Sequence, residues 1–220
     1  MLKGVIFDLD GVIIDSHPVH KKAWRKFLAS VGKQVSDQDL DFVMDGAKKE
    51  DILRHFLGDL SDEEVRAYGH RKEMLFREEA LELNPVDGLP EFLQQLRQAG
   101  IPMALASSGS RRRVHYILQR MGLHRDFQTV ITGDDVPSGK PDPTIFLRAA
   151  DQLGCAHPEL LVVEDAVSGV QAAKRVGMKC LAIVSDGRAQ LLLDAGADHV
   201  VPNFVGLSVD FLHTIGNGGR

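Results

Sequence analysis

The sequence predicts an α/β fold, with a parallel sheet covered by helices and an all-helical domain inserted after the first strand. Short apolar runs alternate along most of the chain with segments whose apolar residues recur every three or four positions. This is the pattern of buried parallel strands alternating with helices. One early region contains only helical patterns. The 220 residues are enough for one α/β core and a smaller accessory domain.

Six apolar runs have the length and the β-branched content of buried strands. They cover residues 2–7, 101–106, 129–131, 160–163, 180–184 and 199–201. Four helical patterns lie between these runs, and each has a glycine just beyond it, as the C-terminal ends of helices commonly do. These glycines are Gly100, Gly122, Gly154 and Gly177.

The region without strands extends from residue 16 to residue 84. Its amphipathic patterns predict at least three helices, and the turn-rich sequence 84–88 indicates the point where the chain returns to the sheet. We therefore predict a Rossmann-like core formed by residues 1–15 and 85–220, with a helical cap domain formed by residues 16–84. The apolar residues of the cap patterns include Trp24, Phe27, Ile52, Leu53, Val65, Met74 and Leu75.

Composition and charge limit the possible partners and locations. The net charge is −5 and no apolar stretch approaches the ~20 residues of a membrane span, so we expect neither nucleic acid nor a membrane as a partner. The N-terminal residues do not resemble a secretion signal, and the spacing of Cys155 and Cys180 indicates neither a disulfide framework nor a zinc site. We expect a cytoplasmic monomer.

Chemically functional residues follow four of the predicted strands. Because the carboxyl ends of parallel strands meet at one edge of a sheet, we expect these residues to lie close together. Neighbouring carboxylates there require a compensating charge, and Mg²⁺ with its oxygen ligands supplies one. The residues are Asp8 and Asp10 after the first run, Ser107, Ser108 and Gly109 after the second, Lys140 after the third, and Glu164 and Asp165 after the fourth.

Each of these groups taken alone is typical of ordinary structure, such as a solvated turn, a serine helix cap or an exposed lysine. Together they predict phosphoryl transfer through an enzyme carboxylate. A metal ion screens the repulsion between a carboxylate nucleophile and a phosphate, and cationic and hydroxyl donors hold the phosphoryl oxygens. The sequence thus predicts a Mg²⁺-dependent enzyme whose substrate is a small phosphorylated molecule.

In this order, the motifs resemble those of the haloacid dehalogenase superfamily. The resemblance is carried by residues 8–15, Ser107, Lys140 and the pair at 164–165. The helical insertion is similar to the cap of the branch that contains β-phosphoglucomutase and phosphoglycolate phosphatase. His20, Trp24 and residues 46–51 also match that branch.

The resemblance implies a role for each motif. Asp8 is the nucleophile that forms an aspartyl-phosphate, and Asp10 acts first as general acid and then as general base. Ser107 and Lys140 bind the transferred phosphoryl group. Mg²⁺ is held by Asp8, the main-chain carbonyl of Asp10 and Asp165, with Glu164 assisting. Substrate-binding positions are implied at His20 and Lys49 in the cap and at Ser108, Gly109 and Arg111 beside the serine.

Two enzymatic reactions and one binding function fit these motifs. β-Phosphoglucomutases typically have a serine and a Lys-Asn pair where this chain has Gly109, Ser110 and Arg111, and a cap arginine where it has Lys49. Because lysine lacks the bidentate fork of arginine, we favour a phosphatase for a sugar phosphate or a phosphoglycolate-like monoester. A phosphomutase is the alternative. A non-enzymatic receiver domain uses similar groups but has no cap insertion.

Three consecutive arginines, Arg111 to Arg113, begin the helix that follows the second strand. A run of charges is ordinarily a solvated helix face. However, the N-terminal end of a helix favours anions over cations, and these arginines lie close to Ser107. The functional alternative is therefore that they contact an anionic group of the substrate.

Overall fold

The computed structural model describes residues 2–44, 47–80 and 83–216. Within these residues six strands form one sheet in the order β3-β2-β1-β4-β5-β6, and every neighbouring pair is parallel. All six predicted runs are strands whose ends shift by no more than two residues. The strands are β1 (Gly4–Phe7), β2 (Met103–Ser107), β3 (Thr129–Thr132), β4 (Leu160–Glu164), β5 (Lys179–Ile183) and β6 (His199–Val201).

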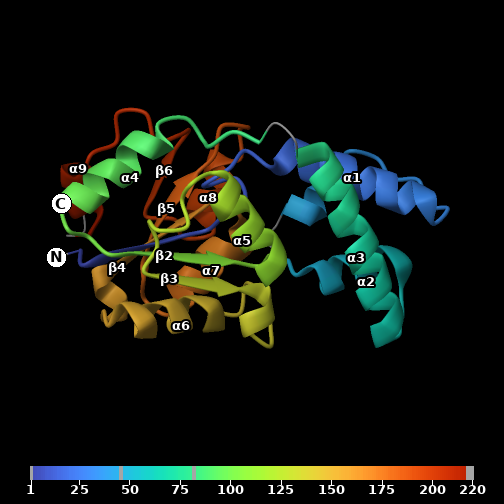
Figure 1. Ribbon diagram of the computed structural model, residues 1–220. Helices are drawn as coiled ribbons and strands as arrows, with labels where there is room; N and C mark the ends of the chain where they lie inside the picture. The colour runs from blue at the N-terminus through green and yellow to red at the C-terminus, as the bar shows by residue number, and fades with distance from the viewer. Residues whose placement is uncertain (1, 45–46, 81–82, 217–220) are drawn as a thin grey trace.

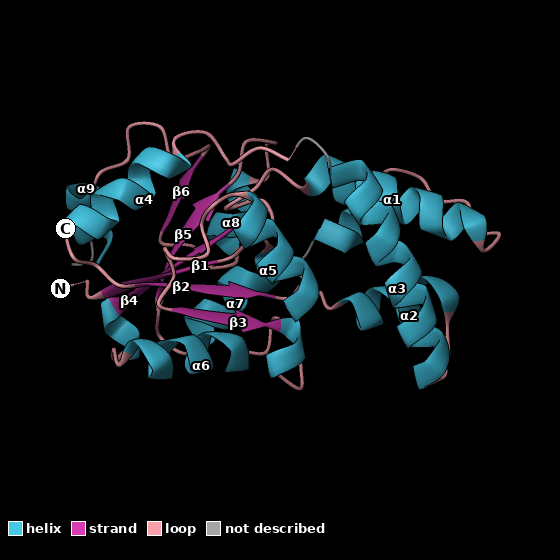
Figure 2. Ribbon diagram, viewed as in Figure 1, coloured by secondary structure: helices cyan, strands magenta, loops and turns pink. Residues whose placement is uncertain are grey.

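Helices cover both faces of the sheet (Figure 2). Alternate residues of β1 point to opposite faces, so Val5 and Phe7 belong to one hydrophobic cluster and Ile6 to the other. The first cluster includes residues of α4 (Leu89–Gln98), α5 (Arg111–Arg120) and α9 (Val209–Gly216). The second includes residues of α6 (Thr144–Leu153), α7 (Val167–Arg175) and α8 (Ala189–Asp194). The core of the α/β part thus consists of two layers separated by the sheet.

The region between β1 and α4 is helical and lies to one side of the sheet (Figure 1). It contains α1 (His17–Ser30), a 3₁₀ segment (Asp39–Met44), α2 (Lys49–Leu57) and α3 (Asp62–Glu79). Trp24, Phe27 and Leu53 belong to a third hydrophobic cluster, formed within these helices. The exact cap boundaries at 15/16 and 84/85 remain our prediction, and Gly46 of the cap motif lies outside the described residues.

One side-chain prediction in the cap is wrong. Met74 is 42% exposed, whereas Lys72 and Glu73 on the same helix are buried. The reason is that the inward face of α3 meets a polar cavity as well as the apolar cap core, so hydrophobicity does not identify it. Lys48, directly before α2, donates a hydrogen bond to the carbonyl of Val136 in the sheet part (2.5 Å). The cap helices therefore contact the core close to that cavity.

The strand order places Asp8 at the point in the sheet where the order of the strands reverses, because β1 lies between β2 and β4. From β1 the chain continues to β2 on one side, and β4 later pairs with the other side. In open α/β sheets such switch points form the crevice in which ligands bind. Gly11 allows the loop after β1 to turn here, because its φ is 74° and a Cβ would lie 2.1 Å from Asp165 Oδ2. No described helix combines the length and apolarity required to cross a bilayer.

Candidate active site

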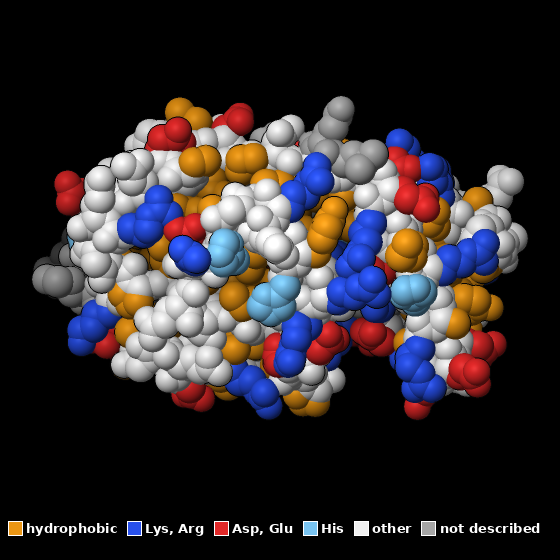
Figure 3. Space-filling view, viewed as in Figure 1, with side chains coloured by type: hydrophobic (Ala, Val, Ile, Leu, Met, Phe, Trp, Pro, Cys, Tyr) orange, Lys and Arg blue, Asp and Glu red, His pale blue; other side chains and the backbone are white. Residues whose placement is uncertain are grey.

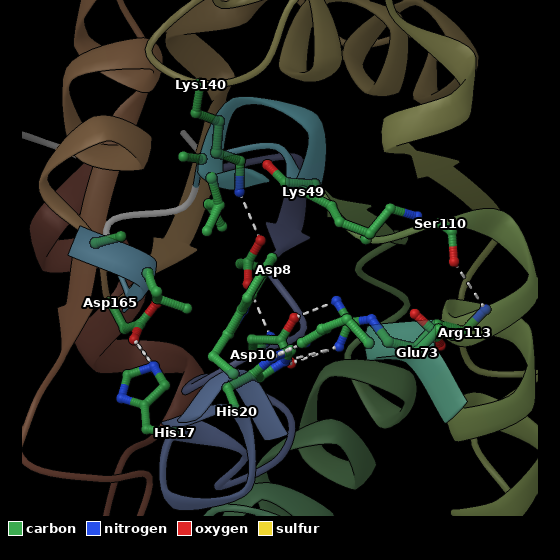
Figure 4. Close-up of a pocket in the computed structure, with 18 of the residues that line it drawn as sticks. Asp8, Asp10, His17, His20, Lys49, Glu73, Ser110, Arg113, Lys140 and Asp165 are labelled. Atoms are coloured by element: carbon green, nitrogen blue, oxygen red, sulfur yellow. Dashed lines mark hydrogen bonds and ion pairs between the residues drawn. The ribbon is translucent and has the colours of Figure 1, made fainter. Parts of the chain in front are cut away.

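Asp8 and Lys140 form the centre of the cavity between the sheet and the cap helices (Figure 4). Asp8 directly follows β1 and is buried. Lys140 Nζ lies 2.5 Å from Asp8 Oδ1 and also donates to Glu164. Burial would lower the pKa of Lys140, but the charges of Asp8 and Glu164 raise it above its usual value. The lysine is therefore a cation held between two carboxylates.

The carboxylates around Lys140 carry more negative charge than the lysine balances. Burial raises the pKa of Asp8 to about 7, although Lys140 opposes this shift. Burial also raises the pKa values of Glu164 and Asp165. Glu164 is packed tightly, since a Cβ on Gly169 would lie 2.0 Å from its carboxyl carbon. A cation bound among these groups would favour their ionised forms.

The oxygen donors fit Mg²⁺. Asp165 Oδ2 is buried and accepts no hydrogen bond of good geometry; its neighbour is His17, whose Nε2 forms an ion pair with it at 2.7 Å. Burial would lower the pKa of His17, but Asp165 raises it above its usual value. Within residues 2–44, 47–80 and 83–216, no three acidic, histidine or cysteine side chains form a complete metal cage. Mg²⁺ does not need one, because it retains water and binds through one or two carboxylates. Asp8, Asp165 and the main-chain carbonyl of Asp10 are the residues that would hold it.

Asp10 is held by a dense set of donors. Arg113 donates to both carboxylate oxygens from Nη1 (2.8 Å) and Nη2 (2.6 Å), and Ser16 Oγ donates to Oδ1 (2.6 Å). His20 Nε2 lies 3.1 Å from the same oxygen. Burial would raise the pKa of Asp10, but the positive charge of Arg113, assisted by His20, holds it well below its usual value. Asp10 is thus ionised in this state.

His20 connects Asp10 to the cap helix α3. Its Nδ1 lies 2.8 Å from Lys72 Nζ, and the Lys72 ammonium is 5.0 Å from the ring centre of Trp24. Burial, with the charge of Lys72, lowers the pKa of His20 to about 3, so the imidazole is neutral. Its Nδ1 then accepts from Lys72 and its Nε2 donates to Asp10. Burial, followed by the charge of Arg113, lowers the pKa of Lys72 to about 7.

The cap side of the cavity is rich in charged groups. Lys49, at the start of α2, lines the cavity together with Lys72 and Glu73. The Oε1 atom of Glu73 is buried and has no hydrogen-bond partner. Lysine and arginine side chains also gather where the sheet part meets the cap helices on the face shown in Figure 3. The cavity itself measures about 80 Å³.

The structure brings together the predicted residues, with one exception. Ser107 is buried and its Oγ accepts a hydrogen bond from Gly109 N (3.1 Å), while Ser108 and Gly109 line the cavity. Arg111, which we expected to bind substrate, is instead exposed and forms an ion pair with Asp135. Positions 111 and 113 are about 200° apart on a helix, so the cavity receives Arg113. The interpretation as a solvated helix face is therefore wrong for Arg113.

The sequence interpretation missed three titratable residues that line the cavity. Two of them, Lys72 and Glu73, look like the solvated face of a helix, and no feature of the sequence marks them. The third had a signal, because His17 lies two residues after Asp15, the last residue of the acidic motif. Arg113 was included in the hypothesis that the cationic run contacts an anionic group of the substrate. The three missed residues are His17, Lys72 and Glu73.

Comparisons with known proteins agree with this geometry. Residues 5–183 match the haloacid dehalogenase-like hydrolase family. The chain is 32% identical over 212 residues to a phosphorylated carbohydrates phosphatase of Thermotoga maritima, covering 89% of this chain and 92% of that protein. It is 33% identical over 221 residues to β-phosphoglucomutase of Bacillus subtilis, covering 96% and 94%. The protein therefore belongs to the haloacid dehalogenase-like hydrolase family, as its motifs predicted.

Solved structures support the fold. A crystal structure of β-phosphoglucomutase from Clostridium difficile superposes with a TM-score of 0.88 at 24% sequence identity, covering 99% of this chain and 98% of that one. At this identity the likeness concerns the fold. The Rossmann-like core predicted from the alternation of strands and helices is thereby confirmed.

Proposed function

We propose that this protein is a Mg²⁺-dependent phosphatase that hydrolyses a small phosphate monoester through an aspartyl-phosphate on Asp8. The observation that carries this proposal is the contact between the buried Asp8 carboxylate and Lys140, at the end of β1 and facing the cavity. The phosphatase from T. maritima supports it. So does a validoxylamine A 7′-phosphate phosphatase of Streptomyces hygroscopicus, 33% identical over 201 residues and covering 89% of this chain and 92% of that protein.

In the first half-reaction a carboxylate oxygen of Asp8 attacks phosphorus and the bond to the leaving oxygen breaks. Lys140, already 2.5 Å from Asp8, holds a phosphoryl oxygen and offsets its charge, and the Ser107 hydroxyl donates to another. Asp10 gives a proton to the leaving oxygen. When bound, Mg²⁺ supplies electrostatic screening between the carboxylate and the phosphoryl oxygens.

In the second half-reaction water cleaves the acyl phosphate. Asp10 takes a proton from that water, and its ionised state in the resting structure suits this role. The earlier proton donation has a further requirement, because a carboxylate held by two guanidinium hydrogen bonds takes up a proton poorly. Arg113 therefore has to release Asp10, and Asp10 has to take up a proton from solvent, before the leaving oxygen can be protonated. The cap helices, which carry His20, exclude bulk water from the site.

A phosphomutase is the second candidate. It is favoured by the similarity to the mutase of B. subtilis and by Arg113, a cation in the cavity able to hold a second phosphate. The placement of Arg111 on Asp135 and the lack of a side chain at Gly109 favour hydrolysis. A non-enzymatic receiver domain is disfavoured by the helices that cover Asp8. The cytoplasmic location and the monomeric state stay predictions.

The fate of the phosphoryl group separates the two enzymatic candidates. With β-glucose 1-phosphate and catalytic β-glucose 1,6-bisphosphate, we expect free phosphate to form faster than glucose 6-phosphate. Each missing charge-assisted contact to a distal phosphate weakens its retention by roughly 1.5–3 kcal/mol, which corresponds to about ten-fold or more. Coupled assays for both products measure the ratio. Faster formation of glucose 6-phosphate would contradict the proposed phosphatase function and support the mutase.

Metal removal should abolish activity. We expect a chelator to stop phosphate release and Mg²⁺ to restore it better than Ca²⁺, because Ca²⁺ takes longer bonds and more ligands and so misplaces the phosphorus relative to Asp8. The measurement is the rate of phosphate release after dialysis and re-addition of each ion. Equal rates with both ions would argue against a compact site at Asp8 and Asp165.

A further inference from the structure

Arg113 reaches from the sheet part into the cap. It belongs to the first turn of α5, and its side chain is only 6% exposed although Arg111 and Arg112 are exposed. The guanidinium carbon lies 5.3 Å from the ring centre of Phe76, a residue of α3. The side chain thus extends along the cavity from the sheet part to α3.

Gly109 provides the space for this guanidinium. The φ of Gly109 is not in the left-handed region, so its backbone conformation does not require a glycine. A Cβ at this position would instead lie 2.3 Å from Arg113 Nη2. The position of the Arg113 guanidinium therefore depends on the lack of a side chain at Gly109.

The cap side of the cavity carries three basic side chains. Once Lys140 is assigned to Asp8 and Glu164, the cavity-lining cations that remain on this side are Lys49, Lys72 and Arg113. Lys49 Nζ lies 3.9 Å from a carboxylate oxygen of Glu50, Arg113 is paired with Asp10, and Glu73 also lines this side. Burial lowers the pKa of Lys72 to about 7, so this amine is only partly charged near neutral pH, and its hydrogen-bond partner is the neutral ring of His20. An anionic group of a substrate would meet the buried guanidinium of Arg113 in this cavity, and buried cations are favourable only when they are paired.

We propose that Arg113 selects substrates that carry a second anionic group besides the transferred phosphoryl group. In the free enzyme its guanidinium rests on Asp10 through two hydrogen bonds. A carboxylate or a phosphate of the substrate replaces Asp10 as the bidentate partner, since the planar fork matches both groups. Asp10 is thereby released toward the leaving oxygen. This inference rests on the proposed function for the position of the transferred phosphate at Asp8.

The test compares two ligands that differ in one group. 3-Phosphoglycerate and glycerol 3-phosphate share a three-carbon chain, and only the first carries a carboxylate. Calorimetric titration with Mg²⁺ is done in an Asp8→Asn background, which prevents turnover. We expect 3-phosphoglycerate to bind about 10-fold to 100-fold more tightly, the range of one charge-assisted contact. Adding Arg113→Gln should bring the affinity ratio close to one, whereas Arg112→Gln, an exposed neighbour, should leave it unchanged.

Further variants and ligands make the test specific. Gly109→Ala should lower the same ratio, because the new methyl group displaces the guanidinium, and Arg113→Lys should give an intermediate ratio. Comparing fructose 1,6-bisphosphate with fructose 1-phosphate shows whether a phosphate serves as well as a carboxylate. A ratio near one in the parent, no measurable binding of 3-phosphoglycerate, or an unchanged ratio in Arg113→Gln overturns the proposal; the last result would make Arg113 a positioning residue for Asp10.

The binding ratio is independent of the reaction that follows. If the wild-type protein releases no phosphate from any monoester, the proposed phosphatase function fails, while a preference that depends on Arg113 still supports the inference. If phosphate is released with equal kcat/KM from both three-carbon ligands, the function holds and the inference fails.

Discussion

Replacing Asp8 by asparagine is expected to lower kcat by on the order of 10⁴-fold or more, the scale seen when a nucleophile is removed. The amide cannot attack phosphorus, and no other carboxylate takes its place, because Asp10 is held by Arg113 and Glu164 by Lys140. Steady-state release of phosphate from a panel of sugar phosphates and phosphoglycolate measures the loss. Activity above about one per cent of the wild type would contradict the covalent mechanism.

Two matched substitutions accompany this experiment. Asp15→Asn makes the same chemical change at an exposed position seven residues further along the chain, and it should leave kcat within about two-fold. Asp10→Asn should retain the metal site but lose proton transfer, typically a 10²-fold to 10⁴-fold effect. Circular dichroism confirms that each variant is folded.

Replacing Lys140 by methionine is expected to lower the free energy of unfolding by about 3–5 kcal/mol in Mg²⁺-free buffer at pH 8, because it leaves two buried carboxylates without their counterion. Lys140 is 6% exposed and contacts both Asp8 and Glu164. Urea unfolding measures the change. Lys174→Met is the control, since Lys174 pairs with Asp198 near the surface and such pairs contribute about 0–1 kcal/mol. Equal losses in the two variants would contradict the structural role of Lys140.

The cost of Lys140→Met should decrease as the pH falls. Burial already raises the pKa of Asp8 to about 7 in the presence of Lys140, and it raises the pKa of Glu164 as well. Carboxylates whose pKa is higher in the folded state than in the unfolded state destabilise the fold while both states are ionised, and protonation relieves this as the pH falls through the folded pKa. The difference in unfolding free energy between variant and wild type should therefore be smaller at pH 6 than at pH 8. A constant difference would argue against unpaired carboxylates as its cause.

Local sequence patterns were sufficient to predict the strands of the sheet and the residues at the centre of the site. The alternation of apolar runs with helical segments predicted six strands, and Pro102, which has no N–H to donate, accounts for the late start of β2 at Met103. Asp8 and Lys140 could be placed together because their positions depend only on where strands and loops end. In a parallel sheet those ends meet at one edge whatever the side chains around them do.

The sequence by itself determined the family, the parallel sheet and the group of carboxylates, hydroxyl and ammonium at its edge. Only the tertiary structure decided which of three adjacent arginines enters the cavity, and it selected Arg113 where we expected Arg111. It likewise buried Lys72 and Glu73 and exposed Met74. The physical reason is that a strand end is specified by local periodicity, whereas the direction of a long side chain depends on the start of its helix and on partners from distant segments. Arg113 meets Asp10, 103 residues away, and Lys72 meets His20, 52 residues away.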